Sequence, residues 1–144
     1  MADRGRRYKP VIDFLGVGPE GALRKVLVVD DEPQAVELLE EFLTAKGYTV
    51  IGASGGEEAL RRLKEEQPHL MLLDIRMPVM DGLEVLKRAR EIDREVGIVM
   101  VTAVNEERMG REALRMGAYD YITKPLDFDY LERVLWVKIT MMTL

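Results

Sequence analysis

The sequence predicts an α/β fold in which a five-stranded parallel sheet is covered by helices on both faces, the doubly wound arrangement. Two features of the 144-residue chain predict it. Five short apolar runs alternate with five longer segments whose apolar residues recur every three or four positions, the spacings of strands and amphipathic helices. The runs are apolar at almost every position, as in parallel strands buried on both faces. Because crossovers between parallel strands are right-handed, the carboxyl ends of all strands should lie along one edge.

The first strand is expected at residues 25–29, which read Lys-Val-Leu-Val-Val. It ends on two acidic residues, Asp30 and Asp31. A helix follows until Gly47 stops it. The inward face of this helix is carried by Val36, Leu39 and Leu43.

The second strand is expected at residues 48–53. Ser54 and Glu57 have the Ser-x-x-Glu form of a capping box, which predicts that a helix begins there. Pro68 ends this unit and leads into the next strand. The inward face of the helix is carried by Ala59, Leu60 and Leu63.

The third strand is the apolar run 71–73, which ends at Asp74. The run is too short for a typical helix and is followed by Pro78 and Gly82, so it reads as a buried strand. The next helix should start at Asp81 or Gly82. Its inward face is carried by Leu83, Leu86 and Ala89.

The fourth strand is expected at residues 98–101 and ends on Thr102. Asn105 is a residue type that caps helices, so a helix should begin there and close at Gly117. The apolar residues of this helix are Met109, Ala113 and Met116.

The fifth strand is expected at residues 118–122, and Lys124 follows it. Asp127 should open the last helix of the chain. The inward residues of this helix are Leu131, Val134 and Leu135.

The length of the chain predicts one domain, which we place at residues 25–138, with an N-terminal extension at 1–24 that is flexible or loosely docked and a short tail at 139–144. Residues 1–25 carry six Lys/Arg against three Asp/Glu, whereas the rest of the chain carries 15 against 23. An acidic body argues against general nucleic-acid binding.

The chain has no cysteine, which excludes disulfides and thiolate metal sites, and its single histidine, His69, is expected at the entry to a strand. No apolar run approaches the roughly 20 residues needed to span a bilayer.

Five polar residues follow the strands closely, so all of them should gather at one edge of the sheet: Asp30, Asp31, Asp74, Thr102 and Lys124. Three carboxylates crowded together repel one another unless a cation is present. Oxygen ligands without Cys or His favour a hard ion, and Mg²⁺ is the usual one. With a lysine and a hydroxyl beside the ion, such a site could neutralise a phosphoryl group during its transfer.

Each of these residues also has a purely structural interpretation. Asp74 could merely end a strand, and Asp31 could be only the N-cap of a helix, worth about 1 kcal/mol. Thr102 could be an ordinary β-branched residue at a strand end, and Lys124 a solvated surface charge. Taken together at one edge of one sheet, the five residues favour the functional interpretation.

Four segments resemble the receiver domain of two-component response regulators, similar to the chemotaxis regulators: VLVVDDEP, LLDIRMPVMDGLEVL, VTA and DYITKP. The resemblance covers about residues 25 to 138, with the segments in the right order and on the right elements. It implies the flavodoxin-like three-layer sandwich with strand order 2-1-3-4-5.

The resemblance also implies a role for each site residue. Asp74 would be the phosphoacceptor that attacks the phosphorus of a phosphohistidine. Asp31 and Asp74 would hold Mg²⁺ together with the backbone carbonyl of Arg76, and Asp30 would act largely through water. Lys124 would pair with the phosphoryl oxygens and precede a cis peptide bond to proline.

A conformational switch is implied as well. Thr102 would move to hydrogen-bond the phosphoryl group, and Tyr121 would turn inward into the space that Thr102 vacates. Alternatively, Tyr121 is a plain core aromatic. In the switch, the face made by the fourth helix, the fifth strand and the fifth helix would change shape, and phosphorylation would bias two preexisting packings.

The partners implied are a sensor histidine kinase or a histidine phosphotransfer protein and a downstream protein target, in the cytoplasm, with no direct nucleic-acid or membrane contact. Only about six residues follow the last helix, so a complete chain would be a stand-alone receiver that signals by docking. An apolar strip outside the core, available for a target or a homodimer, is expected at Tyr130, Val137 and Met141. The alternative is that this strip packs against the N-terminal extension.

Two other functions compete with a phosphorylatable switch. A Mg²⁺-dependent phosphohydrolase also uses an aspartyl nucleophile after a strand, but it usually places a second Asp two residues later. The corresponding positions after the three aspartates hold Glu32, Pro33 and Arg76. A flavin binder of the same topology would carry a Ser/Thr/Gly-rich phosphate loop after the first strand, where this chain has acidic residues that would repel phosphate.

Overall fold

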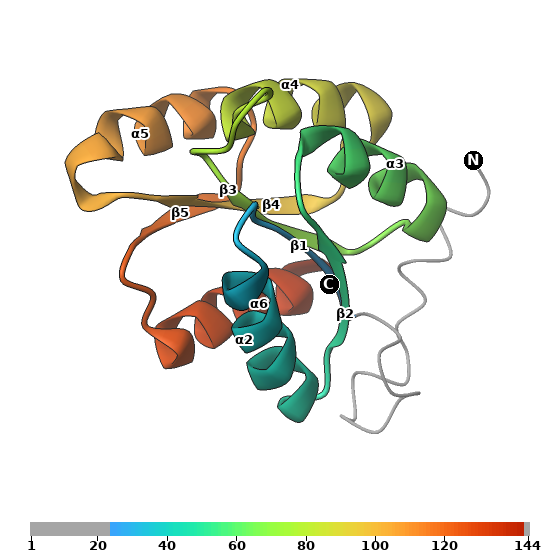
Figure 1. Ribbon diagram of the computed structural model, residues 1–144. Coiled ribbons are helices and arrows are strands. Elements are labelled where there is room, and N and C mark those ends of the chain that lie inside the picture. Colours follow the sequence, from blue (N-terminus) through green and yellow to red (C-terminus); the bar gives the residue numbers. More distant parts are fainter. Residues whose placement is uncertain (1–23, 143–144) are drawn as a thin grey trace.

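The computed structural model describes residues 24–142, which form a five-stranded parallel sheet between two layers of helices (Figure 1). The strands are β1 Lys25–Val29, β2 Thr49–Ala53, β3 Leu70–Asp74, β4 Gly97–Thr102 and β5 Asp120–Thr123. The helices are α2 Pro33–Ala45, α3 Gly56–Glu66, α4 Gly82–Ile92, α5 Glu107–Arg115 and α6 Phe128–Met142, with a 3-10 turn η2 at Val104–Glu106. The strand order is β2-β1-β3-β4-β5, and every neighbouring pair is parallel. The expected fold class and strand order are confirmed.

Each strand contributes alternate side chains to two separate hydrophobic cores. One core lies beneath α3, α4 and α5 and takes Leu27 and Val29 from β1, while the other lies against α2 and α6 and takes Val26 and Val28. The two helical layers are visible above and below the sheet in Figure 1. This two-sided burial explains why the strands are apolar at nearly every position.

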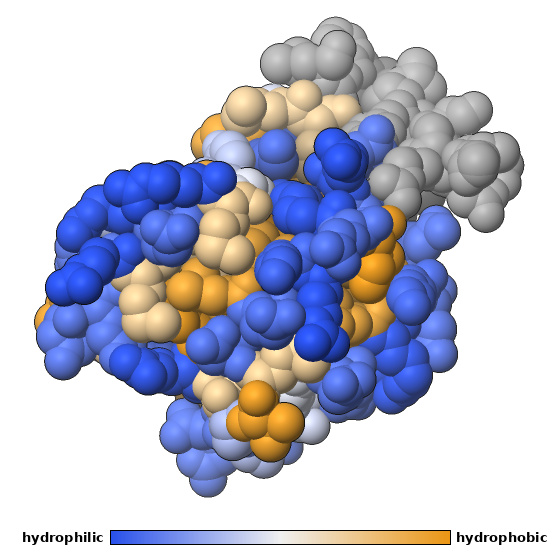
Figure 2. Space-filling view, turned by 90° about the horizontal axis from the view of Figure 1, so that it is seen from above, coloured by the Kyte–Doolittle hydropathy of each residue, from blue (hydrophilic) through white to orange (hydrophobic). Residues whose placement is uncertain are grey.

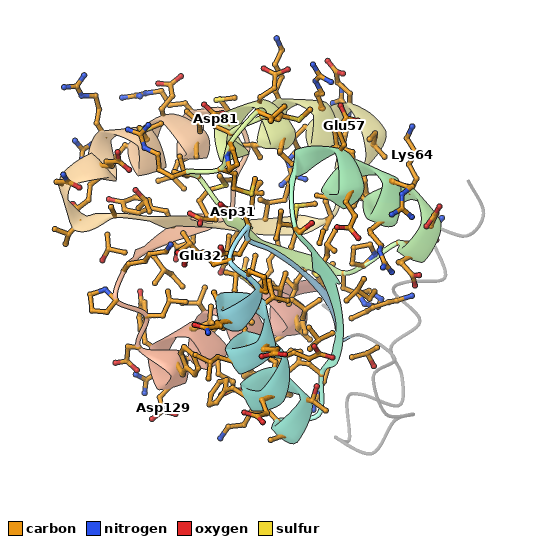
Figure 3. The ribbon with its side chains drawn as sticks, in the orientation of Figure 1. Asp31, Glu32, Glu57, Lys64, Asp81 and Asp129 are labelled. Carbon is orange, nitrogen blue, oxygen red and sulfur yellow. The ribbon has the colours of Figure 1, made fainter. Side chains whose placement is uncertain are left out.

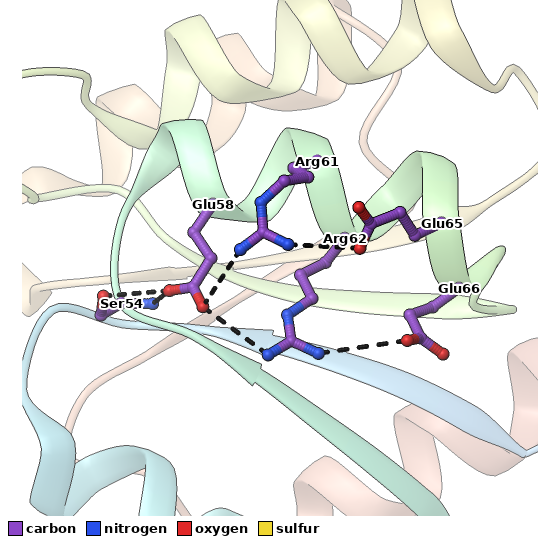
Figure 4. Close-up of polar contacts among 6 residues, drawn as sticks. All are labelled: Ser54, Glu58, Arg61, Arg62, Glu65 and Glu66. Atoms are coloured by element: carbon purple, nitrogen blue, oxygen red, sulfur yellow. Dashed lines mark hydrogen bonds and ion pairs between the residues drawn. The ribbon is translucent and has the colours of Figure 1, made fainter.

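The outer surface of the α3, α4 and α5 layer is largely hydrophilic, with hydrophobic residues visible between the charged ones (Figure 2). On α3, two arginines lie between glutamates one helical turn away (Figure 4). Such exposed pairs stabilise a helix by only about 0.3–0.5 kcal/mol each. None of the helices in residues 24–142 is long and apolar enough to cross a membrane.

The boundaries of the elements agree with the sequence to within about two residues except at the end of α6, but two of the predicted helix caps are wrong. The helix α3 has Gly55 as its N-cap without a side-chain cap, so the predicted capping box of Ser54 with Glu57 is wrong. Instead, the amide and hydroxyl of Ser54 both donate to Glu58 Oε1, at 2.8 and 3.1 Å (Figure 4). The hydrogen bond from the backbone amide of Ser54 is the main reason why the pKa of Glu58 lies below its usual value.

The predicted cap at Asn105 is also wrong. The chain first makes the turn η2, and α5 begins only at Glu107, with Glu106 as N-cap and no side-chain cap. The other two predicted starts are confirmed, because Asp81 Oδ1 accepts the amide of Glu84 at 3.0 Å and Asp127 Oδ1 accepts that of Tyr130 at 3.1 Å.

The two ends of the chain fall partly outside the described residues. The expected extension at 1–24 lies outside them except for Arg24, whose guanidinium carbon lies 4.7 Å from the centre of the Trp136 ring. At the other end, α6 continues to Met142, so most of the stretch expected as a tail is helical. Residues 143–144 lie outside the described part of the chain.

Candidate functional site

Three carboxylates meet at the carboxyl ends of the central strand β3 and its neighbour β1. One oxygen each from Asp30, Asp31 and Asp74 lies within 4.8 Å of the others. The register of the strands explains this, because Val29 pairs with Leu73 and the next residues along each strand are the acids. Figure 3 labels Asp31 at the end of β1, between the two helical layers. Sequence position and sheet register thus gather the three predicted metal-ligating aspartates at one point.

Asp74 is buried in this cluster, with 5% of its surface exposed. It continues the alternation of β3 on the side of α2 and α6, where Leu70 and Leu72 are buried. The Nζ of Lys124 lies 3.3 Å from Asp74 Oδ2, and the amide of Arg76 donates to Oδ1 at 3.3 Å. Burial raises the pKa of Asp74, the charge of Lys124 lowers it, and the charge of Asp30 raises it again, with a net rise.

Lys124 directly follows β5, which lies beside β4, and the peptide bond from Lys124 to Pro125 is cis. The amide of Lys124 donates to the carbonyl of Thr102 at 2.8 Å. Burial alone would lower the pKa of Lys124, but the charge of Asp74 and the hydrogen bond to it raise the pKa overall. The Lys124 ammonium is therefore paired with Asp74, and 41% of the lysine side chain remains exposed.

The other two acids differ in their surroundings. Asp30 is 6% exposed and its Oδ1 accepts the amide of Glu32 at 2.9 Å, which fixes the loop after β1. Asp31 is exposed, and the N-cap of α2 is Glu32 rather than Asp31. The alternative interpretation of Asp31 as a helix cap is therefore wrong, and its carboxylate is available to a ligand.

Thr102 ends β4 and is 1% exposed. Its hydroxyl donates to the carbonyls of Glu106, at 3.1 Å, and Ala103, at 3.3 Å. These acceptors lie in the segment between β4 and α5. Thr102 therefore lies at the predicted edge of the sheet, but its hydroxyl is engaged by the following turn.

Tyr121 lies on β5 with its ring half-buried against the core beneath α5. A Cβ placed on Gly110 of α5 would lie 2.6 Å from Tyr121 Cγ. The ring thus occupies the space that this glycine leaves open. The sequence analysis missed Gly110, and a glycine inside a helical pattern was the available signal.

Two further residues of the site were missed by the sequence analysis. Glu106 pairs with Arg76, whose Nε donates to Glu106 Oε2 at 2.6 Å, and this hydrogen bond holds the pKa of Glu106 below its usual value. Gly82 donates its amide to the carbonyl of Ile75 at 2.7 Å, and a Cβ there would lie 2.4 Å from the backbone oxygen of Asp74. The signal for Gly82 was a glycine at the start of the helix that follows the loop after β3, where backbones approach closely.

A cavity of about 510 Å³ opens beside the acids, between α2 and the segment that follows β5. Asp30, Asp74 and Lys124 form its polar end. Much of its wall is apolar and includes the exposed side chains of Leu38 and Val104. The arrangement offers an open approach to the Asp74 carboxylate.

Comparison with known proteins agrees with this geometry. Residues 26–135 match the family model of the response regulator receiver domain. The chain is 47% identical over 102 residues to the alkaline phosphatase synthesis transcriptional regulatory protein PhoP of Bacillus subtilis, covering 71% of this chain and 42% of that protein. It is 39% identical over 105 residues to sporulation initiation phosphotransferase F of the same organism, covering 73% of this chain and 85% of that protein.

Solved structures of receiver domains are similar to this chain as well. A CheY-like receiver domain protein of Methanospirillum hungatei superposes with a TM-score of 0.79 at 28% identity, covering 83% of this chain and 95% of that one. A chain from the CheX-CheY-BeF3-Mg+2 complex of Borrelia burgdorferi gives a TM-score of 0.73 at 36% identity, covering 79% and 88%. With its parallel sheet in the order 2-1-3-4-5 and its strand-end acids, this chain belongs to the response regulator receiver domain family.

Proposed function

We propose that Asp74 accepts a phosphoryl group from a phosphohistidine of a sensor kinase or histidine phosphotransfer protein. The observation that carries the proposal is the convergence on Asp74 of two further aspartates and the Lys124 ammonium, within 4.8 Å for the acids and 3.3 Å for the amine. A carboxylate oxygen of Asp74 forms the new bond to phosphorus as the bond from phosphorus to the histidine nitrogen breaks. The electron pair of that bond leaves with the imidazole.

The donor set fits Mg²⁺, because it consists of oxygens alone and three carboxylates this close together repel one another unless a cation lies between them. Asp31, Asp74 and the backbone carbonyl of Arg76 would hold the ion, and Asp30 would act largely through water. When bound, Mg²⁺ supplies charge neutralisation for the phosphoryl oxygens. Lys124 supplies a second positive charge from the protein itself, and burial of Asp74 strengthens both interactions.

Phosphorylation would then act on the face formed by α5, β5 and α6. The Thr102 hydroxyl would exchange its acceptor in the turn after β4 for a phosphoryl oxygen. Tyr121 would then turn inward into the space that Thr102 vacates. The exposed side chains of Tyr130, Val137 and Met141 on α6, at 44%, 49% and 50%, support the expected apolar strip. A downstream protein or a second copy of the chain would dock on this face. The alternative, packing against the N-terminal extension, lies outside the described residues.

The function is therefore a switch in a phosphorelay of the cytoplasm rather than turnover of a separate substrate. The phosphohydrolase alternative gains no support, because the side chain two residues after Asp74 is Arg76, which is engaged with Glu106.

The direct test of the proposed phosphorylation is incubation with acetyl phosphate and Mg²⁺ followed by intact mass measurement. We expect one added phosphoryl group with Mg²⁺ and none when the metal is removed with EDTA. Equal labelling with and without the metal would contradict the proposal.

Mg²⁺ should also stabilise the folded protein, because the acids come together only in the folded state. At about 100 times the dissociation constant, the ion should raise the free energy of unfolding by about 2.7 kcal/mol. Thermal unfolding with and without MgCl₂ measures this, with an expected rise in midpoint of about 8 °C. The exposed Asp31 can be replaced without disturbing the core, and Asp31→Asn should lose most of the rise. Asp129→Asn, on the exposed first turn of α6, is the control and should keep it. A full response in Asp31→Asn would contradict the assignment of this ligand.

A further inference from the structure

We propose that Glu106 is a positioning residue that holds Thr102 in the position it has before Asp74 is phosphorylated. Glu106 is in turn held in place by Arg76. The inference rests on the proposed phosphorylation of Asp74. It adds that an ion pair between two loops sets how readily the switch responds. Neither the family match nor the sequence motifs assign a part to Glu106.

The first half of the connection runs from Asp74 to Glu106 through Arg76. The backbone amide of Arg76 donates to Asp74 Oδ1 at 3.3 Å, so the backbone of this residue belongs to the phosphorylation site. Its guanidinium extends away from that site to the other loop, where Nε lies 2.6 Å from Glu106 Oε2 and a second nitrogen contacts the same oxygen. The pair joins residues 30 positions apart in the sequence. It ties the loop after β3 to the turn after β4.

The second half of the connection runs from Glu106 to Thr102. The Glu106 carbonyl oxygen accepts the Thr102 hydroxyl at 3.1 Å, while its amide donates to the carbonyl of Ala103 at 2.9 Å. The side chain of Glu106 is 18% exposed, and its Oε1 is buried without a hydrogen-bond partner. Within residues 24–142, Arg76 is the cation that pairs with this carboxylate. The position of Glu106, and of the carbonyl that holds Thr102, therefore depends on Arg76.

The hydroxyl of Thr102 carries a single proton, so it can donate strongly to the Glu106 carbonyl or to a phosphoryl oxygen but not to both. The two arrangements are alternative states of one equilibrium. Interactions that favour the first state reduce the apparent affinity of the site for a phosphoryl group. Loss of the Arg76–Glu106 pair should therefore make the site bind a phosphoryl mimic more tightly.

The test is the affinity for beryllofluoride, a mimic of the phosphoryl group, titrated at saturating Mg²⁺. We expect Glu106→Gln to bind it about two- to fivefold more tightly than wild type, the effect of losing a partly exposed ion pair. In the Arg76→Gln background, Glu106→Gln should change the affinity hardly at all, because the partner is already absent. Without ligand, the Thr102 methyl resonance of Glu106→Gln should shift towards its position in the beryllofluoride complex, a change that a merely structural role would not produce.

The matched control is Glu84→Gln, which removes a glutamate whose Oε2 is paired with Arg88 at 2.8 Å on the outside of α4. It should bind the mimic as wild type does. An equal gain from Glu106→Gln in both backgrounds would indicate a simple charge effect and overturn the inference, as would an affinity unchanged from wild type. Failure of wild type itself to bind beryllofluoride and to accept phosphate would instead refute the proposed function.

Discussion

Asp74→Asn should gain no phosphoryl group from acetyl phosphate and Mg²⁺ under conditions in which wild type gains one. The amide of Asn cannot act as the nucleophile, and it removes one of the three carboxylates that would hold the metal. The nearby Asp30 and Asp31 cannot substitute directly, because Asp30 is tied to the amide of Glu32 and neither lies against Lys124 in the way Asp74 does. Intact mass measurement after equal incubation times gives the comparison.

The variant should remain folded, which keeps this result interpretable. Burial raises the pKa of Asp74, so its charged form is disfavoured inside the protein and a neutral amide of the same shape imposes no new penalty. Circular dichroism and the unfolding midpoint without Mg²⁺ verify this. Asp129→Asn serves as a control and should be labelled like wild type. A stable adduct on Asp74→Asn at the wild-type level would show that another residue is the acceptor.

Gly82→Ala should lower the free energy of unfolding by about 3 kcal/mol, the upper part of the range for overpacked sites. An added Cβ would lie 2.4 Å from the backbone oxygen of Asp74 and 2.7 Å from Ile75 Cα. These are backbone atoms at the end of β3, which cannot move aside as a flexible side chain can. The same displacement would shift Asp74 relative to Lys124, so labelling by acetyl phosphate should also slow markedly. Urea unfolding and the rate of mass gain are the two measurements.

Gly55→Ala is the matched control for this substitution. Gly55 is the N-cap of α3, and a Cβ there would meet no atom within 4 Å. Its φ of −175° is extended and open to any residue. We expect a loss of at most about 1 kcal/mol, from the weaker capping by alanine, and a normal labelling rate. Similar losses at Gly55 and Gly82 would contradict the role given to the close backbone contact.

Local patterns in the sequence were sufficient for the fold class, whereas the strand order was implied by the resemblance of four segments to receiver domains. The apolar run at residues 25–29 coincides with β1, and Asp81 and Asp127 cap α4 and α6 as their residue type predicts. The failures are at Ser54 and Asn105, where the right residue types are present but the chain makes a different local turn. Helix ends fray and their first turns vary, so a sequence specifies the existence of a helix better than its exact start.

From the residues alone follow the succession of strands and helices along the chain, the edge of the sheet at which the site is expected and the acids expected there. These predictions follow from the spacing of apolar residues and from the handedness of crossovers. Both concern residues or elements that are adjacent along the chain. Three contacts become evident only in the folded chain: Lys124 with Asp74, Gly82 with the backbone of β3, and Arg76 with Glu106. Those contacts join loops that are far apart in sequence, and their geometry depends on how the strands are ordered and how each loop packs. No local pattern of residues carries that information.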